Sequence, residues 1–144
     1  MALKYEGKTA VAGPLIAAAD VSAIPDDVDQ LVAVPMHKRR RRLRGFNQTD
    51  LIVRRLAARL ERPVAKSALR RTRATAPQAR QPDWEARRRN VAGAFAASPR
   101  HAGGRRFLLV DDVTTSGATF DSCAQALLEA GAESVDAWAV ARGG

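Results

Sequence analysis

One short stretch near the end of the chain limits the possible folds more than any other. Four apolar residues, Phe107 to Val110, are followed by two acids, Asp111 and Asp112, and then by a small hydroxyl-rich turn at Thr114 to Thr119. A continuous apolar run of this length is typical of a strand buried on both faces, and we expect the acids to end it. Apolar residues at helical spacing follow, up to a glycine stop at Gly131. The stretch therefore predicts a strand, a turn and a helix.

The first half of the chain contains a second unit of this kind. Leu31 to Val34 form a short apolar run bounded by a proline, which predicts another buried strand. A basic run, Lys38 to Arg44, comes next, and then a helix that Asn47 can cap and that continues to about Leu60. With a final strand at Ser134 to Ala141, the alternation of strands and helices predicts a parallel α/β sheet.

The remaining segments are less strongly patterned. We expect one domain over residues 1–144, because that length builds a single core. In the helix after the turn, Cys123, Leu127 and Leu128 are predicted to face inward, and Trp138 is predicted to lie in the core. The other predicted segments are an N-terminal helical segment at 1–24 (a helix over 2–20 broken near Pro14), a strand at 63–71, a long mobile loop at 70–90 with a helical turn at 84–90, an edge strand at 91–97 and a turn at 99–104.

Composition narrows the function without defining it. The net charge is +9, from 24 basic and 15 acidic residues, and a field of this sign attracts phosphates, whether free, on a nucleotide or on nucleic acid. The single cysteine, Cys123, allows no internal disulfide and no cysteine-based zinc site, and it is expected to be a small core residue. No stretch has the length and apolar character of a membrane span or a signal peptide, so we expect a cytoplasmic location with no membrane insertion.

The residues from 111 to 119 suit a ligand that carries both a diol and a phosphate. Asp111 and Asp112 stand where a strand reaches the carboxyl edge of the sheet, and ligands of open α/β sheets bind at that edge. Carboxylates accept hydrogen bonds from sugar hydroxyls, or hold Mg²⁺ through its waters. Backbone N–H groups around Gly117, the neighbouring hydroxyls and the N-terminus of the following helix favour a phosphate. The alternative is a strand end with two solvated acids and a capped helix.

Phe107 to Thr119 resembles the phosphoribosyl pyrophosphate motif of type I phosphoribosyltransferases, with Ser116 where Thr or Gly is frequent. Three further segments resemble the ComF family, a competence-associated branch of these proteins: Leu3 to Tyr5, Val34 to Gln48 and Arg87 to Val91. The resemblance covers nearly the whole chain, and it implies a three-layer fold with a central, mostly parallel sheet flanked by helices and covered by a mobile hood loop. The family usually begins with a Cys-rich, zinc-ribbon-like segment that this sequence lacks, which predicts a short or truncated version.

The resemblance also implies roles for individual residues. Asp111 and Asp112 would be catalytic, contacting the ribose hydroxyls and lying near the Mg²⁺ that accompanies the ligand, and no residue of the chain is expected to bind the metal directly. The ribose 5-phosphate would be bound by Thr114, Thr115, Ser116, Gly117, Ala118 and Thr119. The pyrophosphate would be bound by Met36, His37, Lys38 and Arg39. The mobile loop would contribute Arg71, Arg73 and Arg88.

Three functions remain open from the sequence. The resemblance implies a phosphoribosyltransferase that uses phosphoribosyl pyrophosphate and Mg²⁺, acts on an unidentified acceptor and has a link to nucleoside metabolism or DNA uptake. A non-catalytic module that binds single-stranded DNA or a competence helicase is the alternative, since the Lys38–Arg44 run and Trp84 would suit nucleic acid as well as they suit solvent exposure and loop packing. A sensor that binds the donor without turnover is the third.

Overall fold

The computed structural model describes residues 21–36, 48–76, 78–114 and 117–142, so the helix predicted at 2–20 lies outside the described residues. The elements follow in the order β1 (Gln30–Ala33), α3 (Gln48–Leu60), β2 (Leu69–Arg71), the 3-10 helix η1 (Gln78–Arg80), α4 (Trp84–Val91), β3 (Phe95–Ala97), α5 (Pro99–Ala102), β4 (Arg106–Thr114), α6 (Ala118–Glu129) and β5 (Ser134–Arg142).

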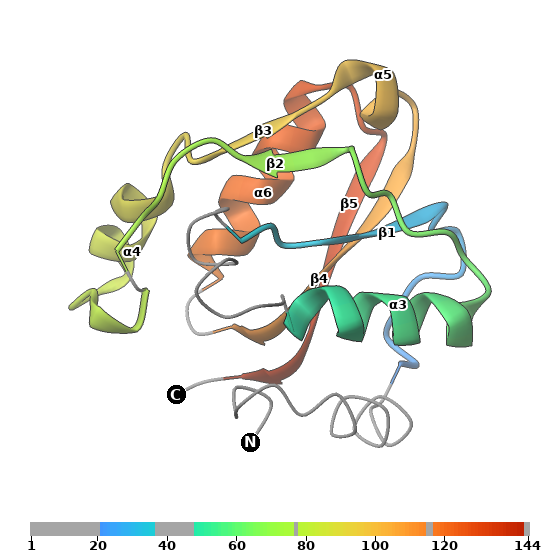
Figure 1. Cartoon of the computed structure of the whole chain (residues 1–144), viewed down its shortest axis with the longest axis horizontal. Helices are drawn as coiled ribbons and strands as arrows, with labels where there is room; N and C mark the ends of the chain where they lie inside the picture. Colours follow the sequence, from blue (N-terminus) through green and yellow to red (C-terminus); the bar gives the residue numbers. More distant parts are fainter. Residues whose placement is uncertain (1–20, 37–47, 77, 115–116, 143–144) are drawn as a thin grey trace.

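The centre of the fold is a parallel sheet in the order β1, β4, β5 (Figure 1). β4 pairs on one side with β1, where Leu31 lies opposite Leu108, and on the other side with β5, where Val110 lies opposite Trp138. Both pairings are parallel, so the carboxyl ends of all three strands meet at one edge. The predicted parallel α/β fold is confirmed.

The core lies on both faces of β4. Phe107 and Leu109 pack in one buried cluster with Cys123 of α6, while Leu108 and Val110 pack in a second cluster with the apolar stripe of α3. Successive side chains of a strand point to opposite faces, which explains why four consecutive apolar residues are all buried. Each such side chain contributes about 1.5–3 kcal/mol by its burial, so β4 is held firmly between the two helices.

A smaller unit, which we call the hood, comprises β2, η1, α4 and β3. β2 and β3 form a separate antiparallel pair with Leu69 opposite Ala97, and in Figure 1 they run together above the sheet, with α4 at their left end. The strand predicted at 63–71 was therefore too long. Val64 makes a single parallel bridge to Leu31 of the main sheet, and the chain then leaves that sheet to pair with β3.

Two segments predicted as irregular contain helices. Within 70–90 lie η1 and α4, and the carboxylate of Asp83 caps α4 by accepting a hydrogen bond from the backbone N–H of Ala86 at 2.7 Å. Since α4 extends to Val91, the predicted edge strand at 91–97 shrinks to β3. The predicted turn at 99–104 holds α5, which begins with Pro99, a residue suited to the first helical position.

Two further expectations near the site were wrong in detail. β4 does not end at the acids but continues to Thr114, because β5 runs alongside it and pairs Thr114 with Arg142. Leu128 does not face inward: its side chain is 50% exposed, since a helical residue lies about 100° around the axis from its buried neighbour Leu127. The stop at Gly131 is confirmed, with φ of 99° and its backbone N–H donating to the carbonyl of Leu128.

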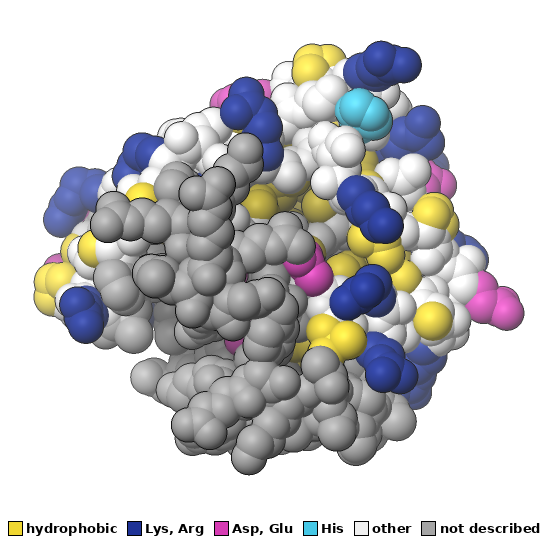
Figure 2. Space-filling view, in the orientation of Figure 1, with side chains coloured by type: hydrophobic (Ala, Val, Ile, Leu, Met, Phe, Trp, Pro, Cys, Tyr) yellow, Lys and Arg dark blue, Asp and Glu magenta, His cyan; other side chains and the backbone are white. Residues whose placement is uncertain are grey.

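Basic side chains are spread over the described surface. Figure 2 shows Lys and Arg side chains dispersed around the rim of one face, with few acidic ones among them. Those of α3, Arg54, Arg55 and Arg59, are exposed. In the described part of the chain, no helix has both the length and the apolar character needed to cross a membrane. The cytoplasmic location stays a prediction.

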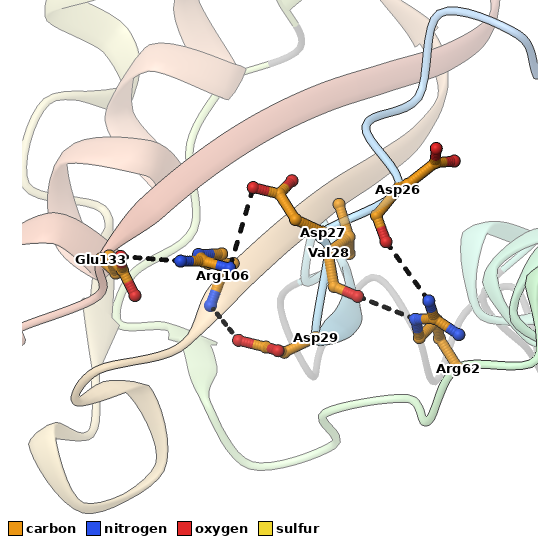
Figure 3. Close-up of polar contacts among 7 residues, drawn as sticks. All are labelled: Asp26, Asp27, Val28, Asp29, Arg62, Arg106 and Glu133. Carbon is orange, nitrogen blue, oxygen red and sulfur yellow. Dashed lines mark hydrogen bonds and ion pairs between the residues drawn. The ribbon is translucent and has the colours of Figure 1, made fainter.

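Two arginines tie the start of the described chain to the amino end of the sheet (Figure 3). Arg62 donates from Nε to the carbonyl of Val28 at 2.9 Å and from a terminal nitrogen to the carbonyl of Asp26 at 3.2 Å. The guanidinium of Arg106 bonds to the carboxylate of Glu133 at 3.0 Å, and its backbone N–H donates to Asp29 at 2.9 Å. The segment before β1 is thus fixed by charge-assisted hydrogen bonds.

We expect Arg62→Ala to lower the free energy of unfolding by about 1–2 kcal/mol, because charged donors to two backbone carbonyls are lost and those carbonyls are left without them. Urea denaturation measures the change. Arg55→Ala, which removes the same charge from an exposed position on α3, is the control and should shift the unfolding free energy by less than about 0.5 kcal/mol. Equal effects of the two substitutions would show that the contacts of Arg62 contribute nothing specific.

Candidate functional site

The candidate site lies at the carboxyl end of β4, where the chain turns into α6. β4 is the central strand of the sheet, with α3 on one face and α6 on the other, so the N-terminal ends of both helices lie near this edge. Asp111 and Asp112 sit in the last part of β4, and both side chains are half-buried. The predicted location at the carboxyl edge of the sheet is therefore present in the structure.

Asp111 is held in place by its neighbours. Its Oδ1 accepts a hydrogen bond from the hydroxyl of Thr49 at 3.2 Å and another from the backbone N–H of Asp112 at 2.9 Å. Thr49 lies in the first turn of α3, 62 residues earlier in the chain, and is itself buried. The sequence analysis missed Thr49, whose only signal was its place at the start of a helix that follows a strand of the same sheet.

The electrostatics around Asp111 favour its protonated form. Burial, and after it the charge of the neighbouring Asp112 carboxylate, together raise the pKa of Asp111 to about 8. Burial, and then the charge of Asp111, also raise the pKa of the Cys123 thiol, while the guanidinium of Arg71 acts to lower it. Cys123 thus lies within electrostatic range of both Asp111 and Arg71. Cys123 is fully buried, as predicted for a small core residue.

The start of α6 has a backbone feature that suits an anion. Gly117 caps α6 with φ of 78°, a left-handed conformation that glycine adopts without strain, and it offers no side-chain acceptor to the first N–H groups of the helix. Ala118 is buried and Thr119 is half-buried in the first turn. Thr114 is the last residue of β4, while Thr115 and Ser116 lie outside the described residues.

The hood packs on α6 through two hydrogen bonds. The side-chain amide of Gln78 in η1 donates to the hydroxyl of Thr119 at 3.3 Å, and the hydroxyl of Ser122 donates to the carbonyl of Val91 at 2.9 Å. One end of the hood therefore contacts a residue predicted to bind phosphate. Gln78 was not singled out from the sequence, because it lies 41 positions from Thr119 in a segment without periodicity.

The three arginines predicted for the hood have different surroundings. Arg71 on β2 is half-buried, with its guanidinium 5.0 Å from the centre of the Phe95 ring and a hydrogen bond to the Thr75 hydroxyl at 2.8 Å. Arg73 donates to the carbonyls of Asn90 at 3.0 Å and Ala92 at 2.7 Å, where it caps the end of α4. Arg71 thus packs on Phe95 within electrostatic range of Cys123, whereas Arg73 is engaged at the end of α4.

Arg88, the third of them, is exposed on α4, and its guanidinium lies 5.5 Å from the ring centre of Trp84, whose side chain is 46% exposed. The pyrophosphate loop is described only at its start: Met36 follows β1 and is half-buried, while His37, Lys38, Arg39 and the rest of the basic run lie outside the described residues. The roles of all these residues stay predictions.

Asp111 and Asp112 suit a cation whose other ligands are oxygens of water and of a phosphate group. Among the described residues, no three His, Cys, Asp or Glu side chains gather into a metal site. Asp111 and Asp112 provide carboxylate oxygens, the ligand type that Mg²⁺ prefers, and Mg²⁺ usually keeps several waters while it uses one or two carboxylates and substrate phosphates. The two residues therefore suit Mg²⁺ that arrives with a phosphorylated ligand better than a resident metal.

Comparison with known proteins finds relatives in enteric bacteria and in Haemophilus. The chain is 40% identical over 114 residues to the DNA utilization protein YhgH of Escherichia coli K12, and 34% identical over 116 residues to Competence protein F of Haemophilus influenzae. Each match covers 79% of this chain but only 49% or 50% of the relative, so the chain spans about half the length of these curated relatives. No model of a known family matches the chain.

Comparison with solved structures finds proteins of similar fold. The glutamine phosphoribosylpyrophosphate amidotransferase of B. subtilis, complexed with ADP and GMP, matches with a TM-score of 0.57 at 20% identity, over 92% of this chain and 25% of that one. A second structure, described as the allosteric regulatory enzyme of purine biosynthesis, matches with a TM-score of 0.56 at 23% identity over the same shares. At such identities the likeness concerns the fold alone.

The raised pKa of Asp111 predicts how stability depends on pH. The pKa of Asp111 is higher in the folded state than its value of 3.8 in the unfolded chain. Between about pH 4 and pH 8 the folded protein therefore binds up to one more proton than the unfolded chain. The contribution of Asp111 to stability is therefore complete below about pH 4 and is lost as pH rises toward 8. The slope is at most about 1.4 kcal/mol per pH unit, and partial exposure of the side chain reduces it.

Asp111→Asn removes this titration. We expect its unfolding free energy, measured by urea denaturation at pH 5, 6, 7 and 8, to gain steadily on that of the unaltered chain as pH rises. Comparing the two proteins in the same buffers cancels the titration of all other groups. Parallel curves over this range would contradict the raised pKa.

Proposed function

Because the chain belongs to the ComF-like group of proteins with the type I phosphoribosyltransferase fold, we propose that it binds phosphoribosyl pyrophosphate with Mg²⁺ at the carboxyl end of β4. The observation that carries the proposal is the short path from two half-buried acids, Asp111 and Asp112, to the N-terminus of α6, where Gly117 provides no side-chain cap. Acids for a diol and helix N–H groups for a phosphate then lie a few residues apart.

In this proposal each part of the site has one task. Asp111 and Asp112 contact the 2- and 3-hydroxyls of the ribose, and in their ionised form they stabilise the positive charge that develops on the sugar as its bond to pyrophosphate breaks. The turn at 114–119 binds the 5-phosphate, and the loop that begins at Met36 binds the pyrophosphate. Asp111 and Asp112 would lie near the Mg²⁺ that accompanies the ligand, and this ion would supply charge that stabilises the leaving pyrophosphate.

The surroundings of Asp111 support this assignment. The hydroxyl of Thr49 and the backbone N–H of Asp112 fix the position of its Oδ1, so the carboxyl group is oriented before a ligand arrives. A carboxyl group with a raised pKa, as at Asp111, is typical of functional sites. The raised pKa of Asp111 also means that a cationic ligand will bind more tightly above about pH 8, where the carboxylate is ionised.

We expect Mg²⁺-dependent, saturable binding of phosphoribosyl pyrophosphate, measured by isothermal titration calorimetry with and without EDTA. Asp112→Asn should weaken this binding at least about tenfold, since it removes the charged carboxylate that accepts a hydrogen bond from the ribose diol. Asp136→Asn, the same charge change near the amino end of β5, is the matched control and should bind as the unaltered chain does. No binding by the unaltered chain at millimolar ligand would remove the proposal.

Binding alone does not separate an enzyme from a sensor. Pyrophosphate release, followed in the presence of candidate acceptors such as nucleobases, amines and single-stranded oligonucleotides, makes this distinction. Release that depends on one class of acceptor identifies an enzyme, whereas binding with no release from any of them identifies a sensor of the donor.

A second candidate is a module that binds single-stranded DNA or a helicase of DNA uptake. The names of the relatives refer to DNA utilization and competence, and the hood displays an exposed aromatic ring, Trp84, with the guanidinium of Arg88 over it. Such a pair offers a stacking surface for a base. Among the residues that the structure describes, the Lys and Arg side chains in Figure 2 are spread around the rim and do not line up in one track for a nucleic-acid backbone, and for that reason we place this candidate second.

The two candidates predict different responses to substitution. If the DNA module is correct, a fluorescent single-stranded oligonucleotide will bind with an affinity that falls steeply with salt, and Trp84→Ala will weaken it by about 1–3 kcal/mol while Asp112→Asn leaves it unchanged. If the sugar site is central, Asp112→Asn abolishes ligand binding and Trp84→Ala does not.

A further inference from the structure

Gln78 is the residue through which the hood contacts the phosphate turn. Its side-chain nitrogen donates to the hydroxyl of Thr119 at 3.3 Å and to the carbonyl of Arg87 at 3.2 Å, and its side-chain oxygen accepts from the amide of Asn90 at 2.7 Å. Three elements, η1, α4 and α6, therefore meet at one carboxamide that is half-buried.

The direction of these hydrogen bonds follows from chemistry alone. A backbone carbonyl can only accept, so the atom of Gln78 that faces the Arg87 carbonyl must be nitrogen. The same argument applies to Asn90, whose amide nitrogen faces the carbonyl of Ala76 at 2.7 Å and so donates its second proton to the oxygen of Gln78. The orientation of both side-chain amides is therefore fixed, because the backbone carbonyls that they face can only accept hydrogen bonds.

This arrangement determines the state of the Thr119 hydroxyl. Because the side-chain N–H of Gln78 donates to Thr119, the hydroxyl oxygen of Thr119 is the acceptor in this hydrogen bond. The hydroxyl proton of Thr119 therefore points away from Gln78. Within the part of the chain that the structure describes, that proton has no acceptor. A phosphate oxygen requires donors, and a hydroxyl at the N-terminal turn of α6 is placed to serve as one.

We propose that Gln78 is a positioning residue for the 5-phosphate: it holds the Thr119 hydroxyl as a hydrogen-bond donor and couples the hood to occupation of the phosphate turn. The inference rests on the proposed function, because it needs a phosphate at that turn. It also gives the hood a specific task, since η1 and α4 then sense the sugar-phosphate end of the ligand through one contact.

The test uses ligands that separate the two ends of the donor. Ribose 5-phosphate, inorganic pyrophosphate with Mg²⁺ and the complete phosphoribosyl pyrophosphate are titrated against the full chain by calorimetry. Gln78→Met removes the amide at nearly constant length and volume. It should weaken binding of ribose 5-phosphate and of the complete donor about tenfold, and should leave binding of pyrophosphate within twofold of the unaltered chain.

Ser122→Ala is the matched control. It too removes one hydrogen bond between α6 and the hood, that to the Val91 carbonyl, but it does not touch Thr119. We expect it to leave ribose 5-phosphate affinity within twofold. If it weakens that affinity as much as Gln78→Met does, the hood acts through packing alone and the positioning role of Gln78 is overturned.

A double-mutant cycle shows whether Gln78 acts through the hydroxyl. Thr119→Val should weaken ribose 5-phosphate binding about tenfold, Thr119→Ser should retain it, and Gln78→Met should have no further effect in the Thr119→Val background. Additive losses would overturn the proposal. Gln78→Glu keeps an oxygen that accepts the hydrogen bond from Asn90 but has no N–H to donate to Thr119. We therefore expect it to weaken ribose 5-phosphate binding at least as much as Gln78→Met does, although the hydrogen bond with Asn90 remains.

The outcomes separate this inference from the function beneath it. If the unaltered chain binds neither ribose 5-phosphate nor the complete donor, the proposed function and the inference fail together. If the unaltered chain binds both and every Gln78 variant with a native thermal unfolding transition binds equally well, the function stands and the role of Gln78 alone is wrong.

Discussion

The burial of β4 on both faces is the constraint on which the rest of the molecule depends. Phe107 and Leu109 pack toward α6, and Leu108 and Val110 pack toward α3, so the strand cannot shift along the sheet without exposing large apolar side chains. Because the position of β4 is fixed, the position of its carboxyl end is fixed as well. Asp111 and Asp112 therefore lie at a defined place on the sheet edge, where the N-termini of α3 and α6 also lie.

Polar contacts at that edge join parts of the chain that are far apart in sequence. Thr49 reaches Asp111 across 62 positions, and Gln78 reaches Thr119 across 41. Each contact connects a helix or hood element to one half of the candidate site, the acids in the first case and the phosphate turn in the second. The site is therefore assembled by tertiary packing around a short local motif.

The local order of strand, acids, turn and helix could be predicted, because each step depends on neighbouring residues. An apolar run of four, a glycine with positive φ at 117 and a glycine stop at 131 carry their structure in their own chemistry. The prediction of strand lengths failed where pairing with another strand determines how far a strand extends. β4 extends to Thr114 only because β5 lies beside it, and the strand expected over 63–71 is short because β3, not the main sheet, pairs with Leu69 to Arg71.

The sequence by itself determined the parallel α/β class, the two acids at a strand end and the glycine turn that follows them, because these depend on periodicity, apolar runs and backbone preferences of adjacent residues. Tertiary structure alone decided which side chains surround the acids. The pKa of Asp111 depends on how deeply packing buries it and on the nearby Asp112 charge, and the donor state of Thr119 depends on Gln78, Asn90 and two backbone carbonyls. Desolvation and hydrogen-bond direction are properties of a packed environment, and no local pattern encodes them.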